Sequence, residues 1–202
     1  TGLQSGLVGW YPFCGNSNDE SLNGNNASNN GATLTADRFG NPNSAYDFDG
    51  NDYLEFTANS YPSGNHAATI SAWVKRTSSP SNVQYIAAFG PQTQYDYQAA
   101  GNVFGLGEYG SSGVFTTHSM AQYDAISNQS INLNDWHHIV CVHSGSGSIS
   151  IYIDGQFAYS QSVNTPSLSP TIGRIGRAVW NSNEYWVGKI DDVGFWERAL
   201  TL

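Results

Sequence analysis

The sequence is poor in charge, and above all in positive charge. Only 11% of its 202 residues are charged, and 7 Lys and Arg stand against 16 Asp and Glu, which gives a net charge of −9. Nucleic acids and anionic membranes are bound through basic surfaces, so we expect neither as a partner. The same balance is compatible with calcium and with neutral glycans.

Cysteines and long apolar runs are also scarce. Cys14 and Cys141 are the two cysteines, and the sequence leaves open whether they form a disulfide or remain two thiols. No apolar run approaches the roughly 20 residues of a membrane-spanning helix, so membrane insertion is not expected. No signal-peptide pattern is present. We therefore expect the chain to begin after processing or to be part of a longer protein, tethered to a catalytic or other extracellular domain.

Short alternating segments separated by Gly, Asn, Ser and Pro clusters run through the whole chain. The segment 148–153 alternates polar and apolar residues, and Asp154-Gly155 follows it as a hairpin turn. No segment has a convincing helical period. The sequence predicts an all-β fold, a two-sheet antiparallel β-sandwich or jelly roll, with strands over 7–13, 45–48, 53–56, 69–75, 85–90, 103–107, 137–143, 148–153, 157–161, 171–175 and 189–196.

Several short motifs occur in one order from end to end and resemble the laminin-G-like, concanavalin A-like jelly-roll domains of secreted bacterial proteins. They begin with Gly6-Leu7-Val8-Gly9-Trp10-Tyr11 and include Trp136-His137-His138-Ile139. The others lie at 23–26, 31–34, 37–41, 45–53, 69–75, 151–155, 172–174, 188–193 and 197–200. Residues 76–135 carry no motif of this kind.

The resemblance implies one domain over residues 1–202, with the first and last strands adjacent. It also implies non-catalytic carbohydrate binding, as a module of a secreted polysaccharide-processing protein. Acidic or sulfated algal-type glycans are among the expected ligands, because Arg174 and Arg177 lie beside aromatic residues in the sequence. Because a fold alone does not determine function, two alternatives stay open. One is a calcium-stabilised adhesion or protein-interaction module of a surface protein. The other is a glycoside hydrolase or polysaccharide lyase.

The acidic stretch Tyr46-Asp47-Phe48-Asp49-Gly50-Asn51-Asp52 raises the question of a calcium loop or a catalytic carboxylate pair. An EF-hand loop needs Gly at its sixth position, where this stretch has Asp52. Alternation places Tyr46 and Phe48 on one face of the strand and the carboxylates of Asp47 and Asp49 on the other. The stretch is therefore interpreted as a strand followed by a turn around Gly50.

Calcium is predicted instead at an acidic, amide-rich loop. Carboxylate, amide and backbone oxygens in such a loop suit a hard cation, and the resembling family often holds a structural calcium there, together with the Asp pair near the last strand. The predicted ligands are Asp19, Asn25 and Asp192, with Asn23 and Asp191 as second choices. Asp191 and Asp192 are neighbours in a predicted strand and are expected to face opposite sides.

Two segments, residues 174–186 and 92–98, combine aromatic rings with amides and charged groups. This is the mixture of side chains that binds sugar rings and their hydroxyls. Trp10, Trp73, Trp136 and Trp196 lie in strand patterns and are predicted to be core residues, whereas Trp180 is expected to be the most exposed tryptophan. Arg174 and Arg177 could bind a sulfate or a uronate. The predicted ligand-binding residues are Trp180, Tyr185, Arg174, Arg177, Asn181, Tyr95 and Tyr97.

Overall fold

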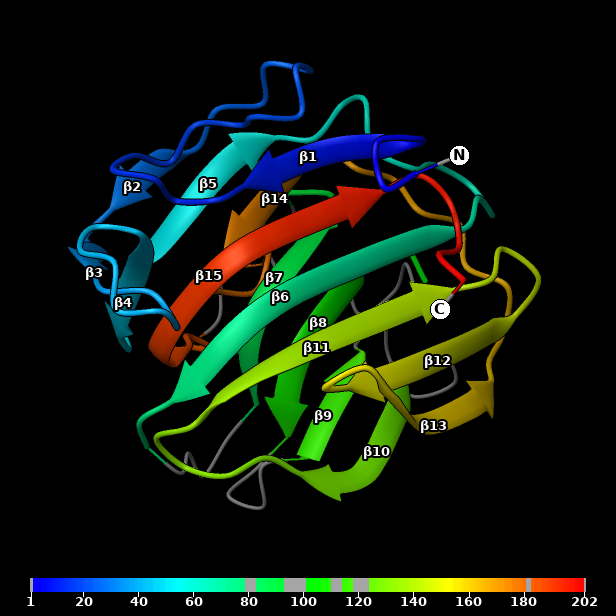
Figure 1. Cartoon of the computed structure of the whole chain (residues 1–202). Helices are drawn as coiled ribbons and strands as arrows, with labels where there is room; N and C mark the ends of the chain where they lie inside the picture. Colours follow the sequence, from blue (N-terminus) through cyan, green and yellow to red (C-terminus); the bar gives the residue numbers. More distant parts are fainter. Residues whose placement is uncertain are drawn as a thin grey trace.

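The computed structural model describes residues 2–78, 83–92, 101–109, 114–117, 124–180 and 183–201. Two antiparallel sheets lie face to face, and the described residues form no helix (Figure 1). The predicted concanavalin A-like β-sandwich is thereby confirmed. No described helix could cross a membrane.

The larger sheet has eight strands and faces the viewer in Figure 1. The first strand of the chain, β1 (Leu7–Tyr11), pairs with the last, β15 (Val187–Trp196), so the two ends of the chain lie close together as expected. The strand order across this sheet is β13 (Gln156–Ser162), β12 (Ser148–Ile153), β11 (Trp136–His143), β6 (Ala68–Arg76), β15, β4 (Ala45–Asp49) and β3 (Thr33–Thr35), with β1 paired to β15.

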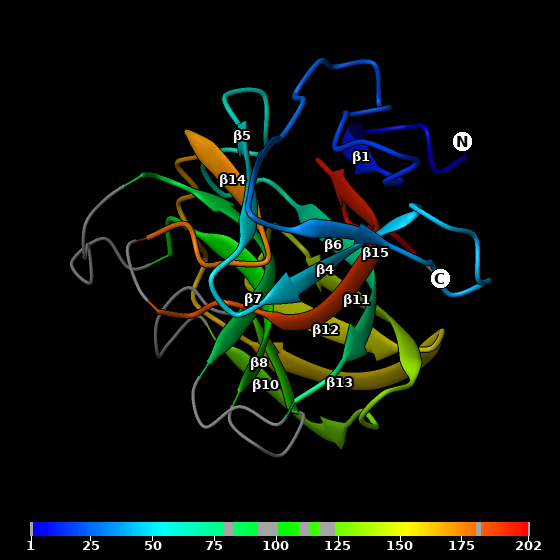
Figure 2. The ribbon, with the colours of Figure 1, turned by 90° about the vertical axis from the view of Figure 1, so that its left-hand side faces the viewer.

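The smaller sheet has seven strands and covers the other side of the core (Figure 2). Its order is β10 (Ala125–Ser130), β9 (Val114–Thr117), β8 (Phe104–Tyr109), β7 (Gln84–Gly90), β14 (Ile172–Ile175), β5 (Tyr53–Thr57) and β2 (Ser28–Asn30).

The core between the sheets is rich in aromatic rings. Phe195 of β15 contacts the rings of Tyr11, Phe56, Tyr61 and Phe89 at centroid distances of 5.3–6.3 Å. Such tilted and edge-on contacts are the favoured geometries of aromatic pairs. The sandwich is thus held by interlocking rings contributed by both sheets.

Alternation along β6 separates the core face from the outer face. Ile70, Ala72 and Val74 are fully buried, whereas Trp73, between them, is only partly buried. Successive strand side chains point to opposite faces of a sheet. Trp73 therefore lies on the outer face of the larger sheet.

One β-bulge interrupts β15. Asp191 lies opposite Trp73 and Gly194 opposite Ser71, so three steps along β15 match two along β6. The bulge sits where the other neighbour of β15 changes from β4 to β1. Asp192 takes a φ of 48°, a left-handed conformation that is uncommon for a residue other than glycine.

The acidic stretch at 46–52 is a strand and a turn, as predicted. Tyr46 and Phe48 are buried, and Gly50 has a φ of 103°. Asp49 accepts a hydrogen bond from the backbone N–H of Asn51, the Asx-type contact that such turns use. Of the two cysteines, Cys14 is exposed and Cys141 buried, and they do not form a disulfide with each other.

Candidate functional site

A cavity of about 320 Å³ opens on the outer face of the larger sheet, over β1, β6, β11 and β15. We call it the tryptophan groove. Three of its walls are indole rings, and its polar groups include a hydroxyl, an imidazole, an amide and one carboxylate. It is lined by Leu3, Gln4, Leu7, Trp10, Ser71, Trp73, His138, Asp192, Gly194 and Trp196.

A glycine in the lining of the groove makes room for the ring of a neighbouring tryptophan. Gly194 pairs with Trp10 across β1 and β15. A Cβ atom at position 194 would lie 2.4 Å from the indole of Trp196, far inside van der Waals contact. The absence of a side chain at Gly194 therefore allows the Trp196 ring to lie over the strand.

A stacked pair forms the opposite wall. The His138 imidazole lies over the Trp73 indole at 5.1 Å between ring centroids, with an interplanar angle of 27°. Its Nε2 is 2.8 Å from the Ser71 hydroxyl. Burial lowers the pKa of His138, so the ring is neutral at neutral pH and offers hydrogen-bonding groups rather than a charge.

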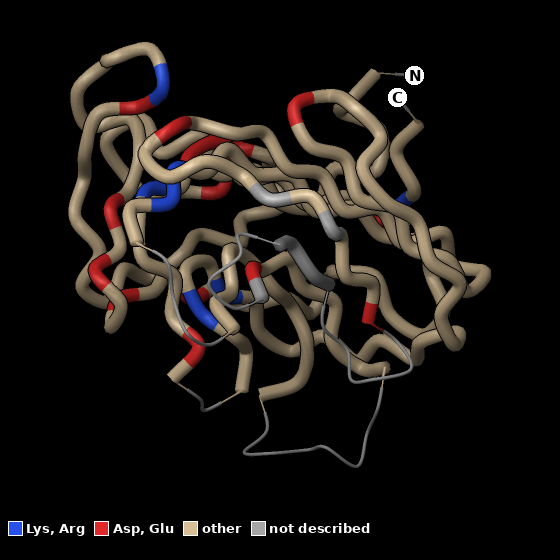
Figure 3. Tube along the Cα trace, turned by 90° about the horizontal axis from the view of Figure 1, so that it is seen from below, with Lys and Arg blue, Asp and Glu red and all other residues tan. Residues whose placement is uncertain are grey.

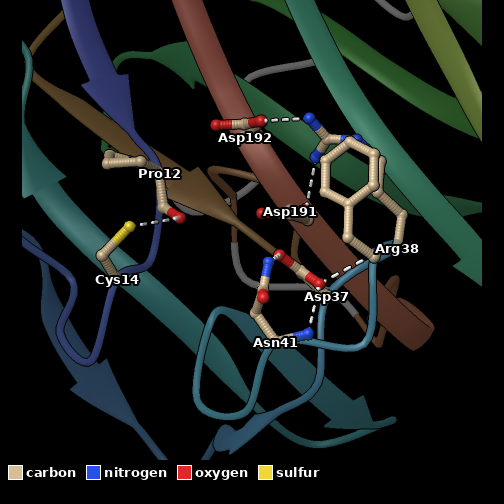
Figure 4. Close-up of polar contacts among 8 residues, drawn as sticks. Pro12, Cys14, Asp37, Arg38, Asn41, Asp191 and Asp192 are labelled. Carbon is tan, nitrogen blue, oxygen red and sulfur yellow. Dashed lines mark hydrogen bonds and ion pairs between the residues drawn. The ribbon is translucent and has the colours of Figure 1, made fainter.

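Arg38 joins this wall to the bulge of β15 (Figure 4). Its guanidinium donates to Asp191 Oδ2 at 2.5 Å and to Asp192 Oδ2 at 2.7 Å, and it lies 4.6 Å from the Trp73 ring centroid. Burial and the neighbouring Asp192 raise the pKa of Asp191 to about 7 although Arg38 acts in the opposite direction. The expectation that Asp191 and Asp192 face opposite sides is wrong, because the bulge turns both toward one guanidinium.

The N-terminal segment closes the remaining side of the groove. The indole N–H of Trp196 donates to the Leu3 carbonyl at 2.6 Å. Arg198 donates to the carbonyls of Ser5 and Gly2. These bonds hold Leu3 and Gln4 against the end of β15, where both line the groove.

The segment predicted to bind ligand forms a second cluster, near β5 and β14, which we call the arginine–tyrosine stack. The guanidinium of Arg177 lies 5.1 Å from the ring centroid of Tyr53 and 4.6 Å from that of Tyr185. Arg174 also lies 5.1 Å from the Tyr53 ring. The structure thus brings together Arg174, Arg177 and Tyr185, and adds Tyr53, which the sequence did not indicate.

Arg174 is a structural residue in this cluster. It is only 3% exposed, and its Nε and Nη2 bond Glu55 at 2.9 and 2.8 Å. Its Nη1 donates to the carbonyls of Ala178, Val179 and Trp180. Asn181, Tyr95 and Tyr97 lie outside the described residues.

The tryptophans are distributed differently from expectation. Trp10, predicted in the core, is 37% exposed. Trp180 is partly buried, donates from Nε1 to Glu184 at 2.8 Å, and meets Tyr85 edge-on. The signal that could have identified Trp73 is the polar spacing Ser71, Trp73, Lys75, which puts it on the solvent face of its strand.

The residues predicted to bind calcium already have protein partners. Asp19 accepts backbone N–H bonds from Trp10, Ser21 and Asn25 at 2.9–3.0 Å, and Asp192 is paired with Arg38. The side-chain amides of Asn23 and Asn25 donate to the backbone carbonyls of Leu7 and Val8, respectively. The described part of the chain has no cluster of three or more His, Cys, Asp or Glu side chains able to hold a metal ion. Calcium stays a prediction, and a bound ion would compete with these donors.

A family model described as the concanavalin A-like lectin/glucanases superfamily, of the laminin G type, matches residues 48–202. The chain belongs to this family. The predicted resemblance is confirmed, and the matched region includes β6, β11 and β15 of the groove. A search of curated proteins gives no significant match.

Solved structures with the same fold include a domain of an arabinanase, the binding domain of a mosquitocidal protein and a sialidase. Domain 4 of AbnA, an extracellular arabinanase from Geobacillus stearothermophilus, solved in complex with arabinotriose, has a TM-score of 0.74 at 18% identity, over 96% of this chain and 94% of that domain. The binding domain of Paraclostridial Mosquitocidal Protein 1 has a TM-score of 0.75 at 18% identity, over 99% of this chain and 51% of the other. Trypanosoma rangeli sialidase has a TM-score of 0.69 at 18% identity, over 98% of this chain and 31% of the other. At this identity the similarity shows the fold.

Proposed function

We propose that the protein is a non-catalytic carbohydrate-binding module and that the tryptophan groove holds its glycan. The observation that carries the proposal is the convergence of three indoles and a stacked imidazole around about 320 Å³ on an outer sheet face. Aromatic faces accept the apolar C–H face of a sugar ring, while hydroxyl, imidazole and carboxylate groups bind its hydroxyls. A volume near the lower end of the range for small-molecule sites suits a chain end or a short segment.

The fold of domain 4 of the arabinanase, which was solved with arabinotriose, supports a glycan ligand by analogy. Domains of the laminin G type are typically extracellular. We infer a secreted protein in which the module holds a partner domain on its polysaccharide and so raises the local concentration of substrate.

The carboxylates near the groove support binding rather than hydrolysis. Glycosidases use two carboxyl groups on either side of the scissile bond. Asp192 is the one carboxylate in the lining of the groove, and the side chain of Asp191 is only 3% exposed beneath Arg38. Both carboxylates bond the same guanidinium, so they do not flank an open space.

An affinity-gel screen against soluble polysaccharides tests the proposal. The panel contains β-glucans, arabinans, galactans, alginate, carrageenans and fucoidans, with Trp73→Ala and Trp180→Ala as paired variants. We expect at least one polymer to retard the wild type and Trp180→Ala but not Trp73→Ala, with no release of reducing ends. Binding that depends on Trp180 would move the site to the arginine–tyrosine stack, where Arg177 would favour an acidic or sulfated glycan. Release of reducing ends would contradict the non-catalytic role.

A further inference from the structure

The lining of the tryptophan groove, among the residues that the structure describes, contains a carboxylate and no Lys or Arg side chain. Asp192 is the one charged residue in the lining, and its side chain is 29% exposed. Since His138 is neutral at neutral pH, the lining carries a net negative charge.

Among the described residues, Arg38 and Arg198 are basic side chains next to the lining. Arg198 donates to the carbonyls of Ser5 and Gly2, on either side of the lining residues Leu3 and Gln4. The binding groups of Arg38 are committed as well. Its two terminal nitrogens bond Asp191 and Asp192. Its flat face is covered by aromatic rings, with the Phe39 centroid at 4.5 Å and that of Trp73 at 4.6 Å. Two carboxylates for one guanidinium leave this cluster neutral or negative, so Arg38 cannot serve as a receptor for sulfate or carboxylate.

Other basic residues on this sheet face stand outside the groove. Lys75 follows Trp73 by two positions on β6, and Lys189 lies opposite Lys75 on β15. Neither lines the cavity, and Lys189 donates to the Thr35 hydroxyl at 2.8 Å. The described part of the chain trace carries few Lys and Arg positions (Figure 3), and Lys75 and Lys189 form one pair of them across β6 and β15.

The bulge of β15 places the carboxylate of Asp192 in the lining of the groove. Without the extra residue, side chains along β15 would alternate between the core and the outer face. The left-handed backbone of Asp192 is the kind of local strain that concentrates at functional sites. A carboxylate held there accepts hydrogen bonds from sugar hydroxyls and repels a like charge.

We propose that the tryptophan groove selects uncharged glycans and that Asp192 determines this selectivity, by accepting bonds from sugar hydroxyls and repelling carboxylated or sulfated rings. The proposal rests on the proposed function. It commits the groove to the neutral class, and it assigns an acidic glycan, if one binds, to a different surface.

Pairs of polymers with the same backbone test the selectivity. Calorimetry with hydroxyethylcellulose and carboxymethylcellulose, agarose and chemically sulfated agarose, and dextran and dextran sulfate compares neutral with anionic chains. We expect the neutral member of at least one pair to bind about tenfold or more tightly than its anionic counterpart, a gap that narrows as salt rises. Asp192→Asn should weaken binding of the neutral polymer and reduce the difference in affinity between the neutral and the anionic polymer. Asp135→Asn, which removes the same charge from an exposed turn outside the lining, should leave the gap unchanged.

The outcomes separate the two proposals. Equal or tighter binding of the anionic member, still abolished by Trp10→Ala, would overturn the selectivity and leave the binding function intact. If Asp192→Asn leaves the affinity ratio between neutral and anionic polymers unchanged, Asp192 does not determine the selectivity. Absence of binding to every polymer would overturn the proposed function and the selectivity with it.

Discussion

Replacing Trp10 by alanine removes the most accessible ring of the groove. Trp10 is 37% exposed, and a tryptophan presents up to about 250 Å² of surface, so roughly 90 Å² is available to a sugar. At about 25 cal/mol per Å² of apolar surface covered, this contact is worth about 2 kcal/mol. The dissociation constant should therefore rise about 30-fold in Trp10→Ala.

Calorimetry with the polymer selected by the screen measures this change, and the melting temperature shows whether the variant is folded. Phe157→Ala is the matched control, because Phe157 is a 60% exposed aromatic residue on β13, at the edge of the same sheet. It should bind like the wild type. Trp10→Phe should retain part of the affinity, since a smaller ring covers less of the sugar.

The reasoning would be refuted by a stable Trp10→Ala variant that binds as tightly as the wild type. Equal losses of polymer affinity in Trp10→Ala and Phe157→Ala would also contradict the assignment of the groove as the binding site. They would indicate that binding depends nonspecifically on exposed aromatic surface.

Three further predictions concern stability. Arg174→Ala should lower the free energy of unfolding by about 2–4 kcal/mol in denaturant titrations, because it leaves the partly exposed Glu55 carboxylate without its partner and the buried carbonyls of Ala178 and Val179 without a donor; a loss below about 1 kcal/mol would contradict this structural role. The pKa of Asp191 is raised from 3.8 to about 7, so its contribution to stability is complete below pH 3.8 and is lost as pH rises through about 7. The loss is about 4 kcal/mol at most, and Asp191→Asn should flatten that slope in melts from pH 4 to 8; an equally steep slope in the variant would contradict it. A structural calcium, predicted from the loop at Asp19, should make EDTA lower the melting temperature of the wild type but not of Asp19→Asn; an unchanged wild-type value would refute the calcium prediction.

Much of the fold could be predicted from residue alternation and turn chemistry. Each predicted strand segment coincides with a strand of the structure, because alternation and Gly- or Asn-rich turns mark half-buried strands directly. The strands that were missed, β2, β3, β9 and β10, are short or polar. Their pairing depends on neighbouring strands, which a local pattern does not contain.

The groove was harder to predict than the fold. The strand patterns of Trp10 and Trp73 predict core positions, but a strand has two faces, and only the sheet arrangement decides which one is covered. Trp10 is exposed and Trp73 only partly buried, whereas Trp196 is buried as predicted. The exposed face of β6 was readable from the polar neighbours of Trp73. The position of Trp10 beside Gly194 depends on pairing between the two ends of the chain.

The orientation of the carboxylate pair could not be predicted from the sequence for a different reason. Asp191 and Asp192 meet Arg38, which lies 153 residues away from Asp191 in sequence, through a bulge that arises only in the pairing of β15 with β6. Regular alternation predicts opposite faces for them. A register shift of this kind is a property of two strands together, so the sequence of one strand does not contain it.

The most direct test is a titration followed by the indole N–H signals of the 6 tryptophans in a nitrogen–proton NMR spectrum. The polymer selected by the screen, cut to oligosaccharides, is added to labelled protein, and single substitutions assign each signal. The account predicts that the Trp10, Trp73 and Trp196 signals shift while those of Trp180 and Trp186 stay in place. Shifts confined to Trp180, or binding that leaves the three groove signals unmoved, would contradict it.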